Sequence, residues 1–218
     1  MTETEVIVEP LSRITSVVIW LHGLGATGHD FEPITSQFSH QIRRETRFIF
    51  PHAEKRPVTI NGGMIMPAWY DIYDVSLGGT VDTEGMNRTQ MRLDRYIQEA
   101  IETGINSQRI VIAGFSQGGV IALREALSER FKLAGYIALS TYLPGSQHVK
   151  PASKVPNPPV FLAHGRNDQL IPIEAAELAR DQLEATGFDV EWKPYPMQHE
   201  VSTQEIADID SWLLRVLY

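Results

Sequence analysis

The sequence predicts an α/β fold with a mostly parallel central sheet and helices on both faces. Short runs of β-branched and apolar residues alternate along the chain with segments of helical periodicity, an order typical of strand–helix–strand units. Several runs, such as VVIWL and IVIAG, are continuously apolar, as expected of strands covered on both faces. A chain of 218 residues is long enough for one such domain and short for two, so we expect residues 1–218 to form a single domain.

Seven segments are expected to form strands, because they are rich in apolar and β-branched residues bounded by turns: residues 5–8, 16–21, 47–50, 109–114, 133–139, 159–163 and 189–193. Four others place apolar residues at helical spacing: residues 83–103, 117–129, 173–186 and 203–217. The apolar stripe of the first helix includes Ile101, and that of the third includes Leu178. In parallel sheets, ligands bind beyond the carboxyl ends of the strands, so a functional site is expected in the loops there.

Composition and charge exclude several classes of function. The net charge is −8 and the sequence has no run of Lys and Arg, which argues against nucleic acid as a partner. The absence of cysteine excludes disulfides, thiolate metal sites and a cysteine nucleophile. The acidic N-terminus lacks the features of a signal peptide, and no apolar run is long enough to span a bilayer. We therefore expect a cytoplasmic protein without integral membrane association.

A first glycine-rich turn, HGLGATG at residues 22–28, directly follows the expected strand 16–21. Its G-x-G-x-x-G spacing is found in dinucleotide sites, but the next strand ends in Pro51 and His52 rather than in an acidic residue. A plain structural turn is a second interpretation. A third is an oxyanion hole, in which glycines allow backbone N–H groups to face a carbonyl oxygen.

A second glycine-rich turn, GFSQGG at residues 114–119, lies between the expected strand 109–114 and a helix that starts at Gln117. A G-x-S-x-G pattern alone arises by chance with a probability of ~0.07 from the Gly and Ser content. The strand–turn–helix context is what a nucleophile elbow requires, because small neighbours allow the sharp turn at the serine. This context makes Ser116 a candidate nucleophile.

A serine hydroxyl needs a base and a group that orients the base. In elbow-containing folds these partners follow the serine in the order carboxylate, histidine. Asp168 in HGRND follows strand 159–163, and His199 in YPMQHE follows strand 189–193. Taken singly, Asp168 also fits a helix cap and His199 a solvated loop, while His164 fits a packed residue at a strand end. The order and the common sheet edge together favour Ser116, Asp168 and His199 as catalytic residues.

Five ordered motifs give the chain a resemblance to a known family. They are HGLG, TINGGMIMPAWYDI, AGFSQGG, HGRND and YPMQHE, and they resemble the phospholipase/carboxylesterase family of α/β-hydrolases, which includes small bacterial carboxylesterases and acyl-protein thioesterases. The resemblance implies an α/β-hydrolase fold without a large cap domain, with Ser116 as nucleophile, His199 as base and Asp168 as its orienting group. It also implies that the backbone N–H groups of Leu24 and Gln117 form the oxyanion hole.

The family resemblance also implies where the acyl group binds. Residues 59–72 look like the loop beside the acyl site, which makes Met64, Met66 and Trp69 candidate substrate-binding residues. The alternative is that these side chains and Tyr70 form a small buried cluster. Relatives often carry Gly before the catalytic histidine, whereas this chain has Gln198, which would be strained if positive φ were required there. The polar stretch 141–158 is too short for a folded cap, so we expect an open, shallow groove.

The expected activity is hydrolysis of short- to medium-chain carboxylic esters through an acyl-enzyme, with no cofactor and no metal. Two alternatives remain: a thioesterase or lysophospholipase with the same triad, acting on an acylated protein or a lysophospholipid, and a non-catalytic binding protein of the same fold. We expect a monomer or a homodimer.

Overall fold

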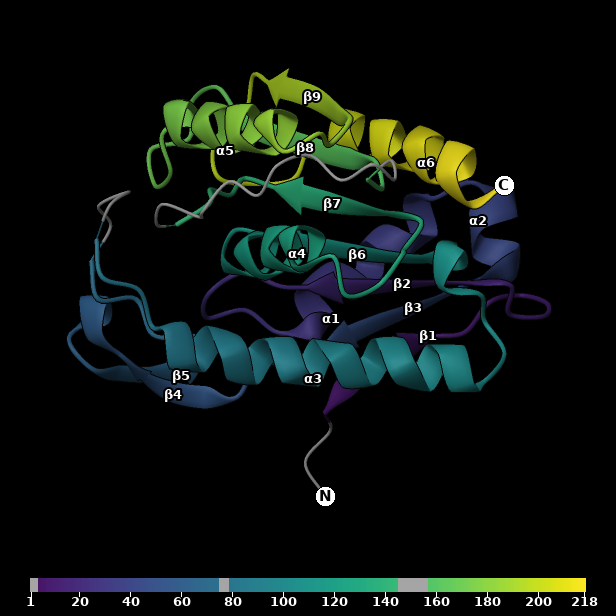
Figure 1. Cartoon of the computed structure of the whole chain (residues 1–218), viewed down its shortest axis with the longest axis horizontal. Helices are drawn as coiled ribbons and strands as arrows, with labels where there is room; N and C mark the ends of the chain where they lie inside the picture. Colours follow the sequence, from purple (N-terminus) through teal and green to yellow (C-terminus); the bar gives the residue numbers. More distant parts are fainter. Residues whose placement is uncertain (1–3, 75–78, 145–156) are drawn as a thin grey trace.

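A computed structural model describes residues 4–74, 79–144 and 157–218 of the chain (Figure 1). Its centre is a seven-stranded sheet of order β1-β3-β2-β6-β7-β8-β9. The strands are β1 (Glu5–Val8), β2 (Ser16–Leu21), β3 (Thr46–Pro51), β6 (Ile110–Phe115), β7 (Gly135–Leu139), β8 (Val160–Gly165) and β9 (Val190–Tyr195). Only β1, at one edge, pairs antiparallel to its neighbour β3, while the other strand pairs are parallel. The predicted mostly parallel sheet is therefore confirmed.

Helices cover both faces of this sheet (Figure 1). On one face lie α3 (Thr83–Glu102), α4 (Gln117–Ser128) and α5 (Ile173–Ala185), whose buried side chains share a core with Val17, Ile19 and Leu21 of β2. On the other face α1 (Gly28–Phe31), α2 (His40–Glu45) and α6 (Thr203–Leu217) share a core with Val18 and Trp20. Alternate residues of β2 thus face opposite layers, and all six are buried, which explains the continuous apolar run in the sequence.

All seven predicted strands and four predicted helices are present, with ends within two residues of the predicted ones. The prediction of a buried apolar stripe is wrong for two residues: Ile101 is 37% exposed and Leu178 is 52% exposed. Each lies at the margin of its helix's apolar face, next to the buried Ala100 and Ala179, where the side chain meets solvent rather than the sheet.

The segment beside the sheet has structure that the sequence did not predict. β4 (Lys55–Val58) and β5 (Met64–Pro67) form an antiparallel hairpin, with the short 3-10 helix η2 (Thr59–Asn61) in its connection. Two further 3-10 helices are η1 (Glu32–Gln37) and η3 (Ser107–Arg109). The hairpin projects from the sheet near the N-terminal end of α3 (Figure 1). Most of the stretch 141–158, which bears on the prediction of an open groove, lies outside the described residues.

Candidate active site

Ser116 is the single residue between β6 and α4, and its backbone has φ 53° and ψ −116°. Few non-glycine residues adopt positive φ, and such backbone strain is typical of functional positions. The turn depends on its glycines, because a Cβ at Gly114 would lie 2.2 Å from Gly118 O, and one at Gly118 would lie 2.3 Å from Leu21 O. The sequence thus forces a tight strand-to-helix turn that presents the serine above the sheet edge.

The first glycine-rich turn lies directly beside this serine. A Cβ built on Gly23 would be 3.4 Å from Ser116 Cβ. Gln117 is the first residue of α4, so its N–H has no partner within the helix. In the described part of the chain, no acceptor takes the Leu24 N–H either. Two unpaired amides on adjoining turns flank the serine, an arrangement suited to binding an oxyanion.

His22 begins that turn, and both nitrogens of its ring are hydrogen-bonded. Its Nδ1 donates to Gly23 O at 2.7 Å, and its Nε2 accepts the Ala53 N–H at 3.0 Å. Burial lowers the pKa of His22 to about 4, so the ring is neutral at physiological pH and its two bonds require one tautomer. Sequence reasoning gave His22 no role, because nothing in a single sequence indicates how a histidine is bonded.

Asp168 and His199 are joined across two neighbouring loops. His199 Nδ1 donates to Asp168 Oδ2 at 2.7 Å, while Asp168 Oδ1 accepts the N–H groups of Leu170 and Ile171, each at 2.9 Å. Both carboxylate oxygens are therefore bonded, and the Asp168 side chain is fully buried. The pair has the geometry of a carboxylate that orients an imidazole.

Backbone contacts fix the distance between these loops. The Arg166 N–H donates to Tyr195 O at 2.7 Å, and the Asn167 N–H donates to Met197 O at 3.0 Å. A Cβ at Gly165 would lie 2.2 Å from Gln198 O, so the glycine permits this close approach. Gln198 itself is not among the positive-φ residues, and the strain considered for it does not arise.

His164 is a further polar residue at this position, buried at the end of β8. Its Nε2 lies 2.8 Å from Ile171 O and 3.4 Å from Asp168 Oδ2. Burial lowers the pKa of His164, which favours a neutral ring that donates to the Ile171 carbonyl. This bond supports the loop that carries Asp168, in keeping with the packed strand-end residue considered from the sequence.

Ser116 and His199 line one cavity of about 560 Å³. In the part of the chain that the structure describes, Ser116 Oγ makes no hydrogen bond with His199. The His199 ring packs against Phe115, with ring centroids 4.8 Å apart. The other lining residues are mostly apolar and come from several loops: Gly23, Leu24, Ala26, Phe31, Ile60, Asn61, Tyr70, Ile72, Phe115, Gln117, Tyr142, Leu170, Ile171, Pro172 and Ala175.

The three residues predicted to bind substrate do not line this cavity, although other residues of their segment do. Ile60, Tyr70 and Ile72 of residues 59–72 line the cavity, whereas Met64, Met66 and Trp69 do not. Met64 is 63% exposed on the hairpin, and Trp69 is buried. The Trp69 ring faces inward, where its Nε1 donates to His22 O at 2.7 Å.

Gln117 has a structural role that the sequence did not reveal. Its side-chain Oε1 accepts the Trp69 N–H at 2.9 Å, and its Nε2 donates to Tyr70 O at 2.7 Å. The residue whose N–H faces the site therefore also holds the cavity wall.

Among the described residues, no group of three His, Asp or Glu side chains is arranged to hold a metal ion. No described helix has the length and apolarity required to cross a membrane.

Comparison with known proteins gives consistent matches over nearly the whole chain. Residues 2–217 match the family model described as Phospholipase/Carboxylesterase. The chain is 39% identical to an acyl-protein thioesterase 1 of Neurospora crassa, covering 95% of this chain and 89% of that protein. It is 32% identical to carboxylesterase SOBER1 of Arabidopsis thaliana, covering 92% and 90%.

Solved structures of similar proteins match the fold as well. The crystal structure of Arabidopsis thaliana SOBER1 has a TM-score of 0.83 at 30% identity and covers 94% of this chain and 100% of that one. That of Zea mays acyl-protein thioesterase 2 has a TM-score of 0.87 at 25% identity and covers 98% and 99%.

Proposed function

This chain belongs to the phospholipase/carboxylesterase family of α/β-hydrolases and is a serine hydrolase of esters or thioesters; on that premise, we propose that Ser116, His199 and Asp168 are its catalytic residues. The observation that carries the proposal is the strained Ser116 in a cavity shared with His199, whose ring is held by a buried carboxylate at 2.7 Å. A binding protein without catalysis would have no need of this combination.

In the proposed reaction, Ser116 Oγ attacks the carbonyl carbon of the substrate while His199 Nε2 accepts its proton. The Asp168 carboxylate holds the tautomer with hydrogen on Nδ1, which leaves the Nε2 lone pair free, and it stabilises the imidazolium that forms. His199 then gives its proton to the departing alcohol or thiol. His199 then takes a proton from water, which attacks the acyl carbon, and this proton passes to Ser116 Oγ as the Oγ–acyl bond breaks and the acid leaves.

The Leu24 and Gln117 N–H groups are the proposed oxyanion hole. They flank Ser116 and lack acceptors in the described part of the chain, so they are free to donate to the oxygen of the tetrahedral intermediate. One such donor typically contributes a factor of ~10²–10³ in rate. Because both groups belong to tight turns at the ends of β2 and β6, they need little reorganisation when the substrate binds.

Labelling with a fluorophosphonate probe tests the nucleophile. We expect the native enzyme to be labelled once, at Ser116, as identified by peptide mass spectrometry. Ser116→Ala should abolish labelling and ester hydrolysis without changing the thermal unfolding midpoint, while Ser211→Ala, on the exposed side of α6, should change neither. Near-native hydrolysis by the Ser116→Ala enzyme would show that another group is the nucleophile.

We further propose that the preferred substrates carry short to medium acyl chains. The cavity of about 560 Å³ offers the apolar surfaces of Ile60, Tyr70 and Ile72 to the acyl group. Each methylene that becomes buried contributes about 0.8 kcal/mol at most, so kcat/KM should rise with chain length and then level off once the cavity is filled.

A panel of oxygen esters and thioesters of increasing acyl length distinguishes the remaining substrates. A higher kcat/KM for oxygen esters at equal acyl length supports a carboxylesterase, and preference for long-chain thioesters or lysophospholipids would favour the alternative activity. Activity only above the micellar threshold of the substrate would contradict an open site acting on dissolved esters.

A further inference from the structure

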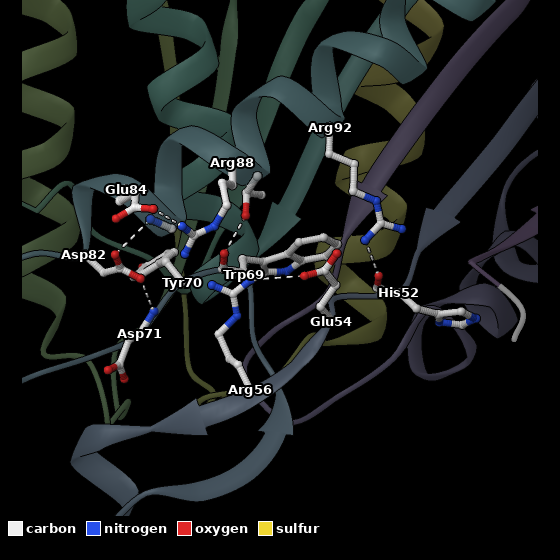
Figure 2. Close-up of polar contacts among 12 residues, drawn as sticks. His52, Glu54, Arg56, Trp69, Tyr70, Asp71, Asp82, Glu84, Arg88 and Arg92 are labelled. Carbon is white, nitrogen blue, oxygen red and sulfur yellow. Dashed lines mark hydrogen bonds and ion pairs between the residues drawn. The ribbon is translucent and has the colours of Figure 1, made fainter.

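A second cavity with four arginines lies away from Ser116, between the β4–β5 hairpin and α3. Its volume is about 210 Å³. Arg56 comes from β4, while Arg88, Arg92 and Arg95 are spaced at i, i+4 and i+7 and therefore lie along one face of α3. We call this set the arginine pocket. Figure 2 shows three of these side chains around Trp69, with Glu54 nearby; Glu54 is the one carboxylate among the described lining residues.

Arg56 is partly buried, and among the described residues its one ion pair is a long one with Glu54. The Arg56 side chain is 18% exposed. Its Nη2 lies 3.7 Å from Glu54 Oε2, and the Glu54 side chain is 78% exposed. The Nε of Arg56 is buried and has no hydrogen-bond partner among the described residues. The carboxylate of Asp82, on the left of Figure 2, also lies close to Arg56, since both groups adjoin Gly85, but it already accepts the N–H groups of Asp71 and Gly85. A guanidinium that is largely removed from water is stabilised further by an anion that contacts it directly.

The arginines of α3 add further positive charge to the same place. Arg92 donates to the carbonyl oxygens of His52 and Thr4, and its guanidinium lies 6.0 Å from the Trp69 ring centre. It also donates to Tyr96 Oη, which bonds in turn to Glu5, so Arg92 makes no direct ion pair among the described residues. Arg95 has no ion-pair partner in the described chain, and Arg88 pairs with Glu84 on its own helix. In a chain of net charge −8, such a concentration of guanidinium groups is unexpected from composition.

We propose that the arginine pocket binds the phosphate group of a small phosphate monoester. Guanidinium groups bind phosphate through paired N–H donors whose planar geometry matches two phosphate oxygens. The pocket has room for a phosphate and adjoining atoms. A larger cavity of about 900 Å³ continues from it and shares Glu54, Arg92 and Arg95, so the organic part of the ligand has space beside Tyr96.

The inference is independent of the catalytic proposal, since no arginine of the pocket lines the cavity around Ser116. Calorimetric titration of the full chain with inorganic phosphate, at constant ionic strength, tests it directly. We expect saturable binding with one phosphate per chain. Glycerol 3-phosphate should compete for the same site, and failure to compete would overturn the assignment to phosphate monoesters.

Two variants and one matched control make the titration specific. Arg95→Gln and Arg56→Gln should each weaken phosphate binding by about tenfold or more, as expected for loss of a charge-assisted hydrogen bond. Arg180→Gln is the control, because it removes the same charge from an arginine on α5, which does not line the pocket. Its binding should equal that of the native chain.

The thermal unfolding midpoint provides a second measurement. Phosphate should raise it in the native chain and in the control, and less in Arg95→Gln, because a ligand bound only to the folded state stabilises that state. Should Arg56→Gln fail to fold, the phosphate binding of Arg95→Gln tests the proposal, because Arg95 is exposed and its replacement does not disturb the core. A response without saturation, or an equal loss of binding in Arg180→Gln, would show that only general charge attraction is present and would overturn the proposal.

Discussion

Replacing Asp168 by Asn tests the proposed orienting role with almost no change in volume. The orientation of the new amide is determined by the backbone. Asp168 Oδ1 accepts two N–H groups, from Leu170 and Ile171, each at 2.9 Å, so the amide oxygen of Asn must take this position. The amide NH₂ then faces His199 Nδ1, which the carboxylate now meets at 2.7 Å.

This forced orientation determines the size of the expected effect. An NH₂ donor opposite Nδ1 requires Nδ1 to be an acceptor, so the hydrogen of the neutral His199 ring moves to Nε2. A ring protonated at Nε2 cannot accept the proton of Ser116, and the charge that stabilises the imidazolium is also lost. Wrong-tautomer substitutions of this kind lower kcat by about 10⁴-fold.

The measurement is steady-state hydrolysis of a soluble short-chain ester, with kcat and KM determined separately. We expect the loss in kcat with a nearly unchanged KM, since Asp168 is buried behind His199. Asp181→Asn is the control, because that carboxylate is exposed on α5 and pairs with Arg180, and its activity should be native. Asp168→Asn with kcat reduced by less than about tenfold would refute the tautomer argument.

Three further predictions concern stability and the cavity wall. The carboxyl of Glu205 is buried, and burial raises its pKa to about 8. The protonated Glu205 carboxyl therefore contributes fully to the stability of the folded state below the ordinary glutamate pKa, and this contribution is lost as the pH rises through about 8. Glu205→Gln should accordingly flatten the fall in thermal midpoint over that pH range, and an unchanged pH profile would contradict this. Gly118→Ala should lower the free energy of unfolding by about 3 kcal/mol, measured in urea, because its Cβ would lie 2.3 Å from Leu21 O. Gln117→Leu leaves a buried N–H and a buried carbonyl of residues 59–72 unpaired, so it should raise KM and cost about 2 kcal/mol in stability; a native KM would argue against its role in holding the wall.

The fold was predictable where the pattern is long or strongly apolar. β2 is recognisable because all six residues are buried, and α3 because 20 residues repeat one apolar stripe. α1 and α2, with four and six residues, are too short for a helical period to emerge. The β4–β5 hairpin was missed because its exposed Met64 and Ile65 break the alternation expected of strands with one buried face.

The candidate site was predictable where it follows from local rules of the backbone. Gly114 is required by a distance of 2.2 Å from a Cβ there to Gly118 O within the turn, so the turn can be recognised in a six-residue window, although Gly118 is required by Leu21 O of the neighbouring strand. The place of Asp168 and His199 follows from the common sheet edge at which parallel strands end. Hydrogen bonds between distant segments, such as that of His164 with the Asp168 loop, have no comparable signature in a single sequence.

Trp69 illustrates why the sequence could indicate that residues 59–72 lie beside the cavity but not which of their side chains line it. A large aromatic residue in a loop beside the active site is an obvious candidate for binding the acyl group. Its N–H and Nε1 instead bond to Gln117 Oε1 and His22 O, and Arg92 stacks over its ring. These partners come from three separate segments, so the inward direction of the ring follows only from the assembled structure. Trp69 therefore bonds to both turns that carry the proposed oxyanion donors, through the Gln117 side chain on one and His22 O on the other, which explains why its side chain is committed to the protein interior.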